Sequence, residues 1–415
     1  MDTRRKYWLF GGLYISQYLG VAFFTVALTA ILRERGVSLQ QIALMQSIGL
    51  VWIFKFLWAP VLDCVGGRRH GHYRSWLLVL QPLIAIALLA ALPLDVVDDL
   101  GVLLAVVAAV GLLSATQDIA TDALAVKTLT LTERGVGNGV QIAGGYVGNI
   151  IGGGLVLIVY DHFGWHWSII VLAAATAIPF VQIIRLREPT AASAPIARAG
   201  PAAVVTLFRQ PGMMIWGFVV LPLSWAGITG IYALMTPLLV DAGWSLSTVA
   251  VAVSIIGGAS GIVGAFLSGG AVTAFGRRRT LLTLMVLQIP VILTLLPLAL
   301  GISPDWLAVT TIVLLQLGYA ATLTLVYTVA MDFSRSWAAG TDFTVMSSFA
   351  ALIGLIAAAG FVAAAGVVGY PVMIACGALL AAVGAGAVAI WFTERHHRVA
   401  DVVEPATPEG AEDIR

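Results

Sequence analysis

Long apolar runs recur along the chain, and each is long enough to cross a lipid bilayer as a helix. An α-helix rises about 1.5 Å per residue, so about 20 apolar residues span the hydrocarbon core. The runs are continuous, whereas the strands of a membrane barrel are about 10 residues of alternating polarity. The pattern therefore predicts an all-α integral membrane protein with twelve transmembrane helices. They are expected at residues 7–32, 39–61, 75–94, 100–126, 136–160, 167–185, 213–240, 247–274, 280–300, 306–331, 343–368 and 371–392.

The composition agrees with a protein that lies in the bilayer. Hydrophobic residues make up 60% of the 415 residues and charged residues only 10%, and the mean hydropathy is +0.98. Soluble domains carry about 25% charged residues. The net charge of +1 gives no field that would favour a nucleic acid. With two cysteines and no metal-ligand, nucleotide-loop or HExxH motif in the sequence, we expect no disulfide framework, metal, cofactor or enzymatic activity.

The charges of the loops predict the orientation. Lys and Arg gather at the N-terminus, after every even-numbered apolar run up to the tenth, and in the C-terminal tail. The opposite loops carry the acids Asp95, Asp98, Asp99, Asp161, Asp241 and Asp305. Positive charge stays on the cytoplasmic side, so both termini are expected in the cytoplasm. The first run lacks a small-residue cleavage site and is expected to be a retained span.

A segment rich in Pro, Ala and Ser, REPTAASAPIARAGPAA, divides the chain near its middle. Its composition is typical of a flexible connection between domains. We therefore expect an N-terminal half at 1–186, a cytoplasmic linker at 187–212 and a C-terminal half at 213–392. The charged, Pro-containing tail at 393–415 is expected to be disordered.

The two halves contain an internal repeat. At an offset of 207 residues, TAILRERGVSLQQIA aligns with TPLLVDAGWSLSTVA through matched Thr, Leu, Gly, Ser and Ala residues. At an offset of 210, VGGRR (65–69) aligns with FGRRR (275–279), and Asp122 aligns with Asp332. Six spans separate each pair, so the halves have the same orientation in the membrane. A parallel repeat of this kind is typical of transporters built from two six-helix halves.

The loop after the second run, LDCVGGRRHGHYR, resembles the loop signature of the major facilitator transporters. The acid, the glycine three residues later and the paired basic residues of that signature correspond to Asp63, Gly66, Arg68 and Arg69. The carboxylate would accept hydrogen bonds from a neighbouring helix N-terminus or an arginine and act as a gate latch. The second copy has Thr273 at the acidic position, so its latch is expected to be weaker. Alternatively, the arginines serve only as a topology signal.

Three charged residues lie within apolar runs, where hydrocarbon disfavours them. Lys55 lies in FKFLWAPVLD, and Asp118 and Asp122 lie in SATQDIATDA, four residues apart and thus on one helix face. Lys55 is eight residues from Asp63, and Asp118 is nine residues from Lys127, so both lie at a similar depth. We predict that Lys55 pairs with Asp118, while Asp122, nearer the helix end, is expected to be reached by water. A static ion pair, a protonation switch and direct substrate contact remain alternative roles.

Polar and aromatic residues of several spans are candidates for a central substrate cavity with little charge. Each taken alone is equally compatible with helix packing. The cavity candidates are Tyr14, Gln17, Phe24, Gln117, Gln141, Tyr146, Asn149, Trp225, Tyr232, Gln316, Tyr319 and Tyr327. Such a lining would suit an aromatic or hydroxamate iron chelate better than a small ion.

Three motifs together resemble one branch of the major facilitator transporters. FKFLWAPVLD, SATQDIATDA and AAGTDFTVMSS look like those of the AmpG-type muropeptide permeases and their sister group, the single-component siderophore importers of the RhtX/FptX type. The resemblance implies a proton-driven importer of the bacterial inner membrane; separately, we expect the protein to be a monomer. QYLGVAFFTVALTAILRERGVSL and HYRSWLLVLQ look more like the siderophore branch. The sequence thus favours import of a ferric siderophore, with a muropeptide or another solute as the alternative.

Overall fold

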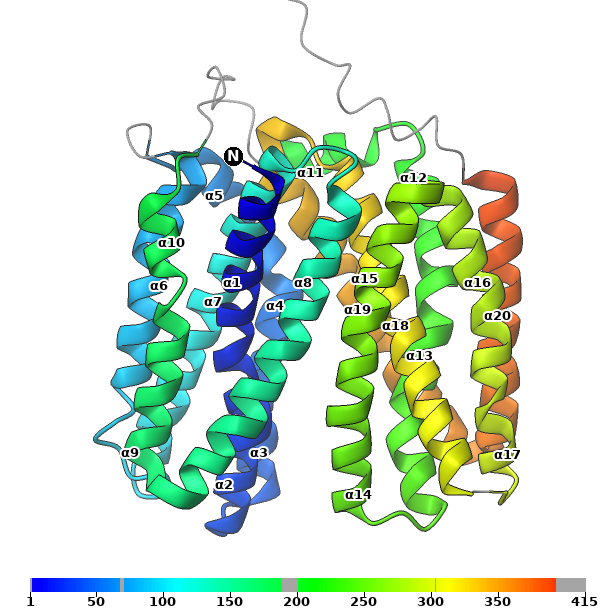
Figure 1. Cartoon of the computed structure of the whole chain (residues 1–415), viewed down its shortest axis with the longest axis horizontal. Helices are drawn as coiled ribbons and strands as arrows, with labels where there is room; N and C mark the ends of the chain where they lie inside the picture. Colours follow the sequence, from blue (N-terminus) through cyan, green and yellow to red (C-terminus); the bar gives the residue numbers. More distant parts are fainter. Residues whose placement is uncertain (1, 68–70, 189–200, 303, 393–415) are drawn as a thin grey trace, which may run out of the picture.

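The computed structural model describes residues 2–67, 71–188, 201–302 and 304–392, and these form two bundles of helices that lie side by side (Figure 1). The N-terminus and α11 lie at one end of both bundles, which we call the linker end; the opposite end is the far end. The predicted tail and Arg68 and Arg69 of the predicted latch lie outside the described residues.

The first bundle contains the helices up to the connecting segment. Its elements are α1 (Thr3–Ala22), η1 (Phe23–Ala27), α2 (Leu28–Glu34), α3 (Leu39–Gln46), η2 (Ser47–Leu50), α4 (Val51–Phe54), η3 (Lys55–Leu57), α5 (Ala59–Cys64), α6 (His72–Leu89), α7 (Leu100–Thr128), α8 (Arg134–Asn149), η4 (Ile150–Leu155), α9 (Val156–Ala177) and α10 (Phe180–Arg185).

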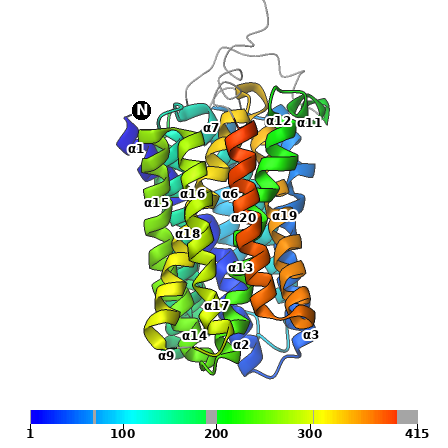
Figure 2. The same cartoon turned by 90° about the vertical axis from the view of Figure 1, so that its right-hand side faces the viewer.

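The second bundle follows the short helix α11 (Pro201–Phe208), which the sequence did not predict. Figure 2 shows α16 and α20 along its outer face. Its elements are α12 (Met213–Ile215), η6 (Trp216–Val220), α13 (Leu221–Asp241), α14 (Leu246–Val251), η7 (Ala252–Gly257), α15 (Gly258–Phe275), α16 (Arg277–Leu293), α17 (Leu295–Ala299), α18 (Asp305–Phe333), η8 (Ser336–Ala338), α19 (Ala339–Val368) and α20 (Tyr370–Trp391).

The predicted spans correspond to these helices, with ends that differ by a few residues. By length and composition, the described residues contain 11 helical stretches able to cross a membrane. One of them, Arg134–Arg185, is 52 residues long and contains two of the predicted spans. Gly164, with φ of 79°, breaks the helix between them. The count of twelve and the count of 11 therefore describe the same architecture.

The repeat appears as the same turn in both bundles at the far end. Gly36 and Gly243 have φ values of 83° and 93°, a region that glycine adopts without steric cost. Two residues later, the side chains of Ser38 and Ser245 accept hydrogen bonds from the backbone N–H groups of Gln41 and Thr248. Each serine thereby caps the helix that follows.

The two bundles meet mainly in the half of the molecule near the linker end. α8 packs against α15 and α18, and α5 and α7 pack against α19. Glycines allow the closest approach: a Cβ on Gly135 would lie 2.7 Å from the carbonyl oxygen of Gly269, and one on Gly139 would lie 2.9 Å from that of Ala265. Toward the far end the ribbons diverge (Figure 1).

A π-helical segment lies where each of the paired helices leaves this contact. η4 follows α8, and η7 precedes α15. A π turn accommodates one extra residue, and such segments occur preferentially at functional sites. η4 itself packs against α1 and η1 of its own bundle.

Candidate functional site

The second span is predicted as one continuous helix, but the structure breaks it beside Lys55. Lys55 begins the short 3₁₀ segment η3, and Trp58 departs from helical geometry with φ of −112° before α5 restarts. Pro60 occupies the first turn of α5, where its missing N–H is not needed. The irregular stretch directs Lys55 inward, leaving it 4% exposed.

The contact expected between Lys55 and Asp118 is present. Lys55 Nζ contacts Asp118 Oδ2, and both residues are buried. Gln17 Nε2 of α1 donates a hydrogen bond to the other oxygen, Asp118 Oδ1. The buried carboxylate thus has a countercharge and an amide donor, as a charge in a low-dielectric site requires.

Asp122 is also buried, so the expectation that water reaches it is wrong. It is 0% exposed, and side chains of α1 and α8 reach it. Tyr14 Oη donates to Asp122 Oδ1 over 2.8 Å, and Gln141 Nε2 donates to the same atom over 3.0 Å. Asp122 Oδ2 lies 3.9 Å from Lys55 Nζ and has no hydrogen-bond partner among the described residues.

This acid–lysine cluster, comprising Lys55, Asp118 and Asp122, holds two carboxylates against one ammonium group. Two ionised carboxylates would leave one unbalanced negative charge in the interior, which is costly. Asp122 Oδ2 is the oxygen with spare acceptor capacity. The arrangement is suited to bind and release one proton.

Asp63, at the end of α5, contacts the N-terminus of α19 in the other bundle. Its Oδ1 accepts from Gly340 N over 2.9 Å, and its Oδ2 accepts from Thr341 N over 2.7 Å and Thr341 Oγ1 over 2.6 Å. Tyr73 Oη also donates to Asp63 Oδ1. The partial positive charge of a helix N-terminus stabilises such a carboxylate. We call this contact the first lock.

Gly340 must be glycine for the first lock to form at this distance, because a Cβ there would lie 2.7 Å from Asp63 Oδ1. Gly66 of the predicted signature is exposed, and a Cβ there would overlap the ring of His72 at 2.3 Å. The latch motif therefore also needs its glycine for close packing of the loop.

The second copy of the loop makes a different contact between the bundles. Arg277 Nε donates to Asp332 Oδ2 over 2.8 Å, and Arg134 Nη1 of α8 donates to Asp332 Oδ1 over 3.1 Å. Arg277 Nη2 also donates to the carbonyl of Leu131. Thr273, the residue at the acidic position, donates to the carbonyl of Thr132 over 3.2 Å. Asp332 of α18 thus supplies the acid that Thr273 lacks; we call this contact the second lock.

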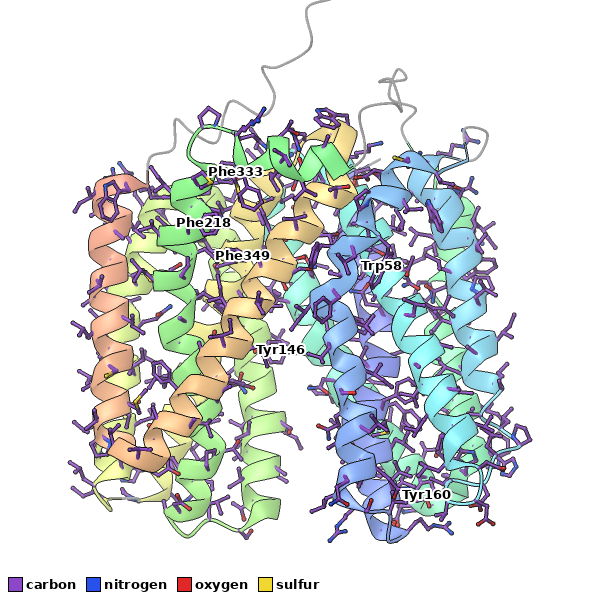
Figure 3. All side chains as sticks on the ribbon, turned by 180° about the vertical axis from the view of Figure 1, so that it is seen from behind. Trp58, Tyr146, Tyr160, Phe218, Phe333 and Phe349 are labelled. Atoms are coloured by element: carbon purple, nitrogen blue, oxygen red, sulfur yellow. The ribbon has the colours of Figure 1, made fainter. Side chains whose placement is uncertain are left out.

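An aromatic and amide cluster lies at mid-depth, where the bundles begin to separate (Figure 3). Tyr146 Oη of the first bundle donates to Gln316 Oε1 over 3.1 Å, and Gln316 Nε2 donates to Tyr232 Oη over 3.2 Å. The rings of Tyr232 and Tyr319 stack with centroids 4.4 Å apart, and Trp225 lies 4.9 Å from Tyr319. Five of the twelve cavity candidates therefore come together.

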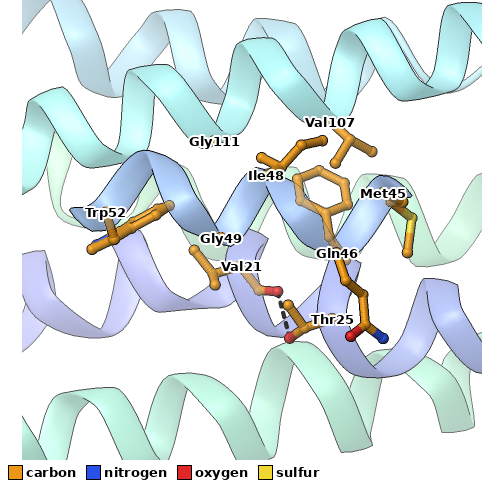
Figure 4. Close-up of a pocket in the computed structure, with 10 residues that line it drawn as sticks. Val21, Thr25, Met45, Gln46, Ile48, Gly49, Trp52, Val107 and Gly111 are labelled. Carbon is orange, nitrogen blue, oxygen red and sulfur yellow. Dashed lines mark hydrogen bonds between the residues drawn. The ribbon is translucent and has the colours of Figure 1, made fainter. Parts of the chain in front are cut away.

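The remaining cavity candidates are dispersed. Tyr14, Gln17 and Gln141 serve the acid–lysine cluster, as described above. Gln117 Nε2 donates to Ser16 Oγ over 3.4 Å within the first bundle. Asn149 is exposed, and Tyr327 lies beside Phe343 with ring centroids 5.7 Å apart. Phe24 lines a small pocket between η1, η2 and α7, whose volume of about 20 Å³ would hold one water molecule (Figure 4).

Sequence reasoning missed several residues of this region. Tyr18 of α1 lies within electrostatic range of both carboxylates and of Tyr319, but a lone tyrosine in an apolar run gave no signal. Arg134 and Asp332 lie in the second lock; the alignment of Asp122 with Asp332 was the available signal. Asp342 stands in the AAGTDFTVMSS motif, which was noted only for its resemblance.

Outside the spans, Glu133 links the N-terminus to the start of α8. Lys6 Nζ lies 2.7 Å from Glu133 Oε2, and Thr3 Oγ1 donates to Oε1 over 2.6 Å. Partial burial raises the pKa of the Glu133 carboxyl, but the hydrogen bonds from Lys6, Thr3 and Thr130 outweigh it and lower the pKa to about 2. This carboxylate lies directly beside Arg134 in sequence.

Two helical bundles in parallel repeat, with polar contacts between them at one end, are an arrangement typical of multi-pass transporters. The chain belongs to the Major Facilitator Superfamily, whose profile matches residues 10–358. Its fold is similar to the Escherichia coli transporter FucP in the outward conformation, with a TM-score of 0.67 and 13% identity over 95% of this chain and 98% of that one. It is also similar to the human organic anion transporter MFSD10, with a TM-score of 0.70 and 14% identity over 94% and 100%.

Among curated proteins, the chain is similar to transporters of bacterial origin. It is 30% identical to the anhydromuropeptide permease of Escherichia coli over 196 residues, which cover 46% of this chain and 39% of the permease. It is 26% identical to the putative transporter AmpG 4 of Rickettsia felis over 162 residues, or 38% and 39% of the two chains. The match therefore spans about two fifths of the length of these relatives.

Proposed function

We propose that the protein is a proton-coupled importer that carries a solute across the bacterial inner membrane by alternating access. The observation that carries this proposal is the acid–lysine cluster. Two buried carboxylates share one lysine, and one carboxylate oxygen has no hydrogen-bond partner among the described residues. Charged groups inside a membrane span are costly and usually have a role in ion or proton movement.

The distribution of contacts supports alternating access. Both locks join the bundles at the linker end, while the mid-depth cluster lies between the locks and the diverging far end. Because Lys and Arg gather in the loops of the linker end, we assign that end to the cytoplasm. In this assignment, the described state is closed toward the cytoplasm.

We propose an anhydromuropeptide as the first substrate to test. The relatives described above support this alternative better than the ferric siderophore that the sequence favoured, and the resemblance to siderophore importers has no counterpart among them. The mid-depth cluster is compatible with it, since stacked rings and an amide bind uncharged rings and polar groups.

In the proposed cycle, Asp122 takes up the proton. Protonation would remove the unbalanced charge and let the hydroxyl of the acid donate a hydrogen bond. Asp118 would remain ionised against Lys55, because that pair already satisfies its charge. Release of the proton after the locks open would reset the cluster, so substrate and proton move in the same direction.

Uptake into proteoliposomes tests this function. Labelled anhydromuropeptide and a labelled ferric siderophore are offered separately, with the outside more acidic than the inside and with or without a protonophore. We expect the muropeptide to accumulate and the protonophore to abolish accumulation. Accumulation of neither solute, or of the siderophore alone, would overturn the proposed substrate. Accumulation that resists the protonophore would overturn proton coupling.

Two matched variants test which residue carries the proton. Asp122→Asn should abolish accumulation but retain exchange of solute between the two sides, because it mimics the protonated acid. Asp161→Asn, the same change at an exposed position on α9, should behave as the wild type. If Asp122→Asn still concentrates the solute, the proton is carried by another residue.

A further inference from the structure

Arg335 lies between α18 and α19, close to the first lock but outside it. Its Nε donates to Asp342 Oδ2 over 2.6 Å, and its Nη2 donates to Asp342 Oδ1 over 2.7 Å. The backbone N–H of Arg335 donates to the same carboxylate over 3.0 Å. Asp342 is 0% exposed. Two parallel bonds of this kind make the strongest type of arginine–carboxylate contact.

The same guanidinium also holds the connecting helix α11. Arg335 Nη1 donates to Thr206 Oγ1 over 2.7 Å, and Nη2 donates to the carbonyl of Ala203 over 2.8 Å. The guanidinium lies 4.3 Å from the ring centroid of Trp337. Every nitrogen of the group is therefore engaged, and α11 is joined to the segment that leads into α19.

Asp342 stands in the first turn of α19, next to the groups that bind Asp63. Gly340 and Thr341, which donate to Asp63, directly precede it. An ionised Asp342 would repel Asp63 and would occupy the partial positive charge of the helix N-terminus. The two carboxylates share one helix end, and Arg335 is the cation that forms an ion pair with Asp342.

We propose that Arg335 is a positioning residue of the gate: it neutralises Asp342 and fixes α11 against η8, which keeps the N-terminus of α19 attractive to Asp63. The proposal rests on the role of the first lock in the proposed function. In this proposal, α11 is part of the gate, and Asp342 of the AAGTDFTVMSS motif is the carboxylate that binds Arg335. The proposal predicts the direction of the effect: when the Arg335 charge is lost, the uncompensated charge of Asp342 repels Asp63 and weakens the first lock.

A thiol reporter in the interface measures opening of the linker end. Ile142 of α8 is 6% exposed and packs against Ala265 and Ala320 of the other bundle. Ile142→Cys is introduced with Cys64→Ser and Cys376→Ser, and the protein is reconstituted in nanodiscs. The rate of alkylation by a hydrophilic maleimide then reports how often the interface opens. Thermal melting of each variant shows that it is folded.

We expect Arg335→Gln to raise the alkylation rate by roughly tenfold, or about 1.4 kcal/mol in the balance of open and closed states, because only part of the lost ion-pair energy acts on the first lock. Adding Asp342→Asn should bring the rate back toward that of the parent, because the repelling charge is then absent. Arg335→Lys retains the cation and should stay near the parent. If the double variant opens as often as Arg335→Gln or more often, the role of Arg335 is only structural and the proposal is overturned.

Asp63→Asn separates this proposal from the gate itself. That variant should raise the rate on its own, and Arg335→Gln should then add nothing. If Asp63→Asn leaves the rate unchanged, the first lock is not a gate, and the proposed closing mechanism fails whatever Arg335 does. If the two changes add fully, the first lock stands but Arg335 acts independently of it, which overturns the proposal.

Discussion

The first and second locks join the same two bundles at the same end, but with different chemistry. In the first lock, the donors to Asp63 among the described residues are all neutral: the backbone of α19 and the hydroxyls of Thr341 and Tyr73. In the second lock, Asp332 accepts from two arginines, Arg134 and Arg277. The repeat therefore preserves the place of the contact but not the groups that form it.

This difference predicts how each lock responds to change. The first lock depends on where a helix end lies, so a shift of α19 weakens it without any change of charge. The second lock depends on the balance of one acid and two bases, all buried or nearly so. Removal of the acid leaves two cations without their partner, which costs more than the loss of neutral donors.

Asp332→Asn should therefore have the largest effect on stability. Leaving a buried cation unpaired costs about 3–5 kcal/mol, so the melting temperature should fall clearly and the linker end should open. Melting in detergent and alkylation of Ile142→Cys measure the two effects. A variant that melts within a degree of the wild type would show that water replaces the carboxylate.

Asp63→Asn should have a smaller effect on stability and a clear effect on opening. The loss of charge against the helix N-terminus costs about 1–2 kcal/mol, since the asparagine oxygen still accepts one hydrogen bond. The alkylation rate should rise about tenfold, with little change in melting. Equal destabilisation by Asp63→Asn and Asp332→Asn would remove the distinction between the locks.

Gly135→Ala should weaken both locks together. The new Cβ would lie 2.7 Å from the carbonyl oxygen of Gly269, a backbone atom that cannot rotate away. Overpacking of this kind costs about 1–3 kcal/mol, and it acts on the closed state alone. Gly318→Ala on α18 is the matched control, because nothing lies within 4 Å of its Cβ. If both variants alkylate alike, the α8–α15 contact does not limit opening.

Glu133→Gln should have the smallest effect on thermal stability, and this effect should be present at neutral pH and absent at strongly acidic pH. The folded-state pKa is lowered to about 2 from the model-peptide value of 4.5, so the stabilising contribution is complete above pH 4.5 and is lost as the pH falls through 2. The wild type should melt slightly higher than the variant at pH 7, and the difference should shrink below pH 4. A difference that grows on acidification would contradict the assigned shift.

The sequence predicted the spans and one internal contact, and the reasons are physical. Apolar length alone sets the spans, and counting residues from the charged helix ends placed Lys55 and Asp118 at one depth. The sequence could not reveal that side chains of α1 and α8 cover Asp122, because this depends on how the helices pack in three dimensions. The contact of Arg134 with Asp332 joins residues 198 apart, so no local pattern indicates it.

The hydrophobic pattern also could not predict where a helix is locally interrupted. The break beside Lys55 leaves the second span apolar throughout, so the span reads as one helix. α11 lies in a Pro- and Ala-rich stretch that reads as a linker, although Ala203 and Leu207 are buried. Tertiary contacts, here those of Arg335, fix structure that composition does not predict.

The π segment η4 has a consequence for how a single span serves two bundles. One residue advances the direction of side chains by about 100° around a helix. The extra residue of the π turn therefore turns the later part of the span away from the face used by α8. α8 packs against α15 and α18 of the other bundle, whereas η4 packs against α1 and η1 of its own. The level at which the two bundles part is thus encoded by the position of one surplus residue, and shifting it along the span would move that level.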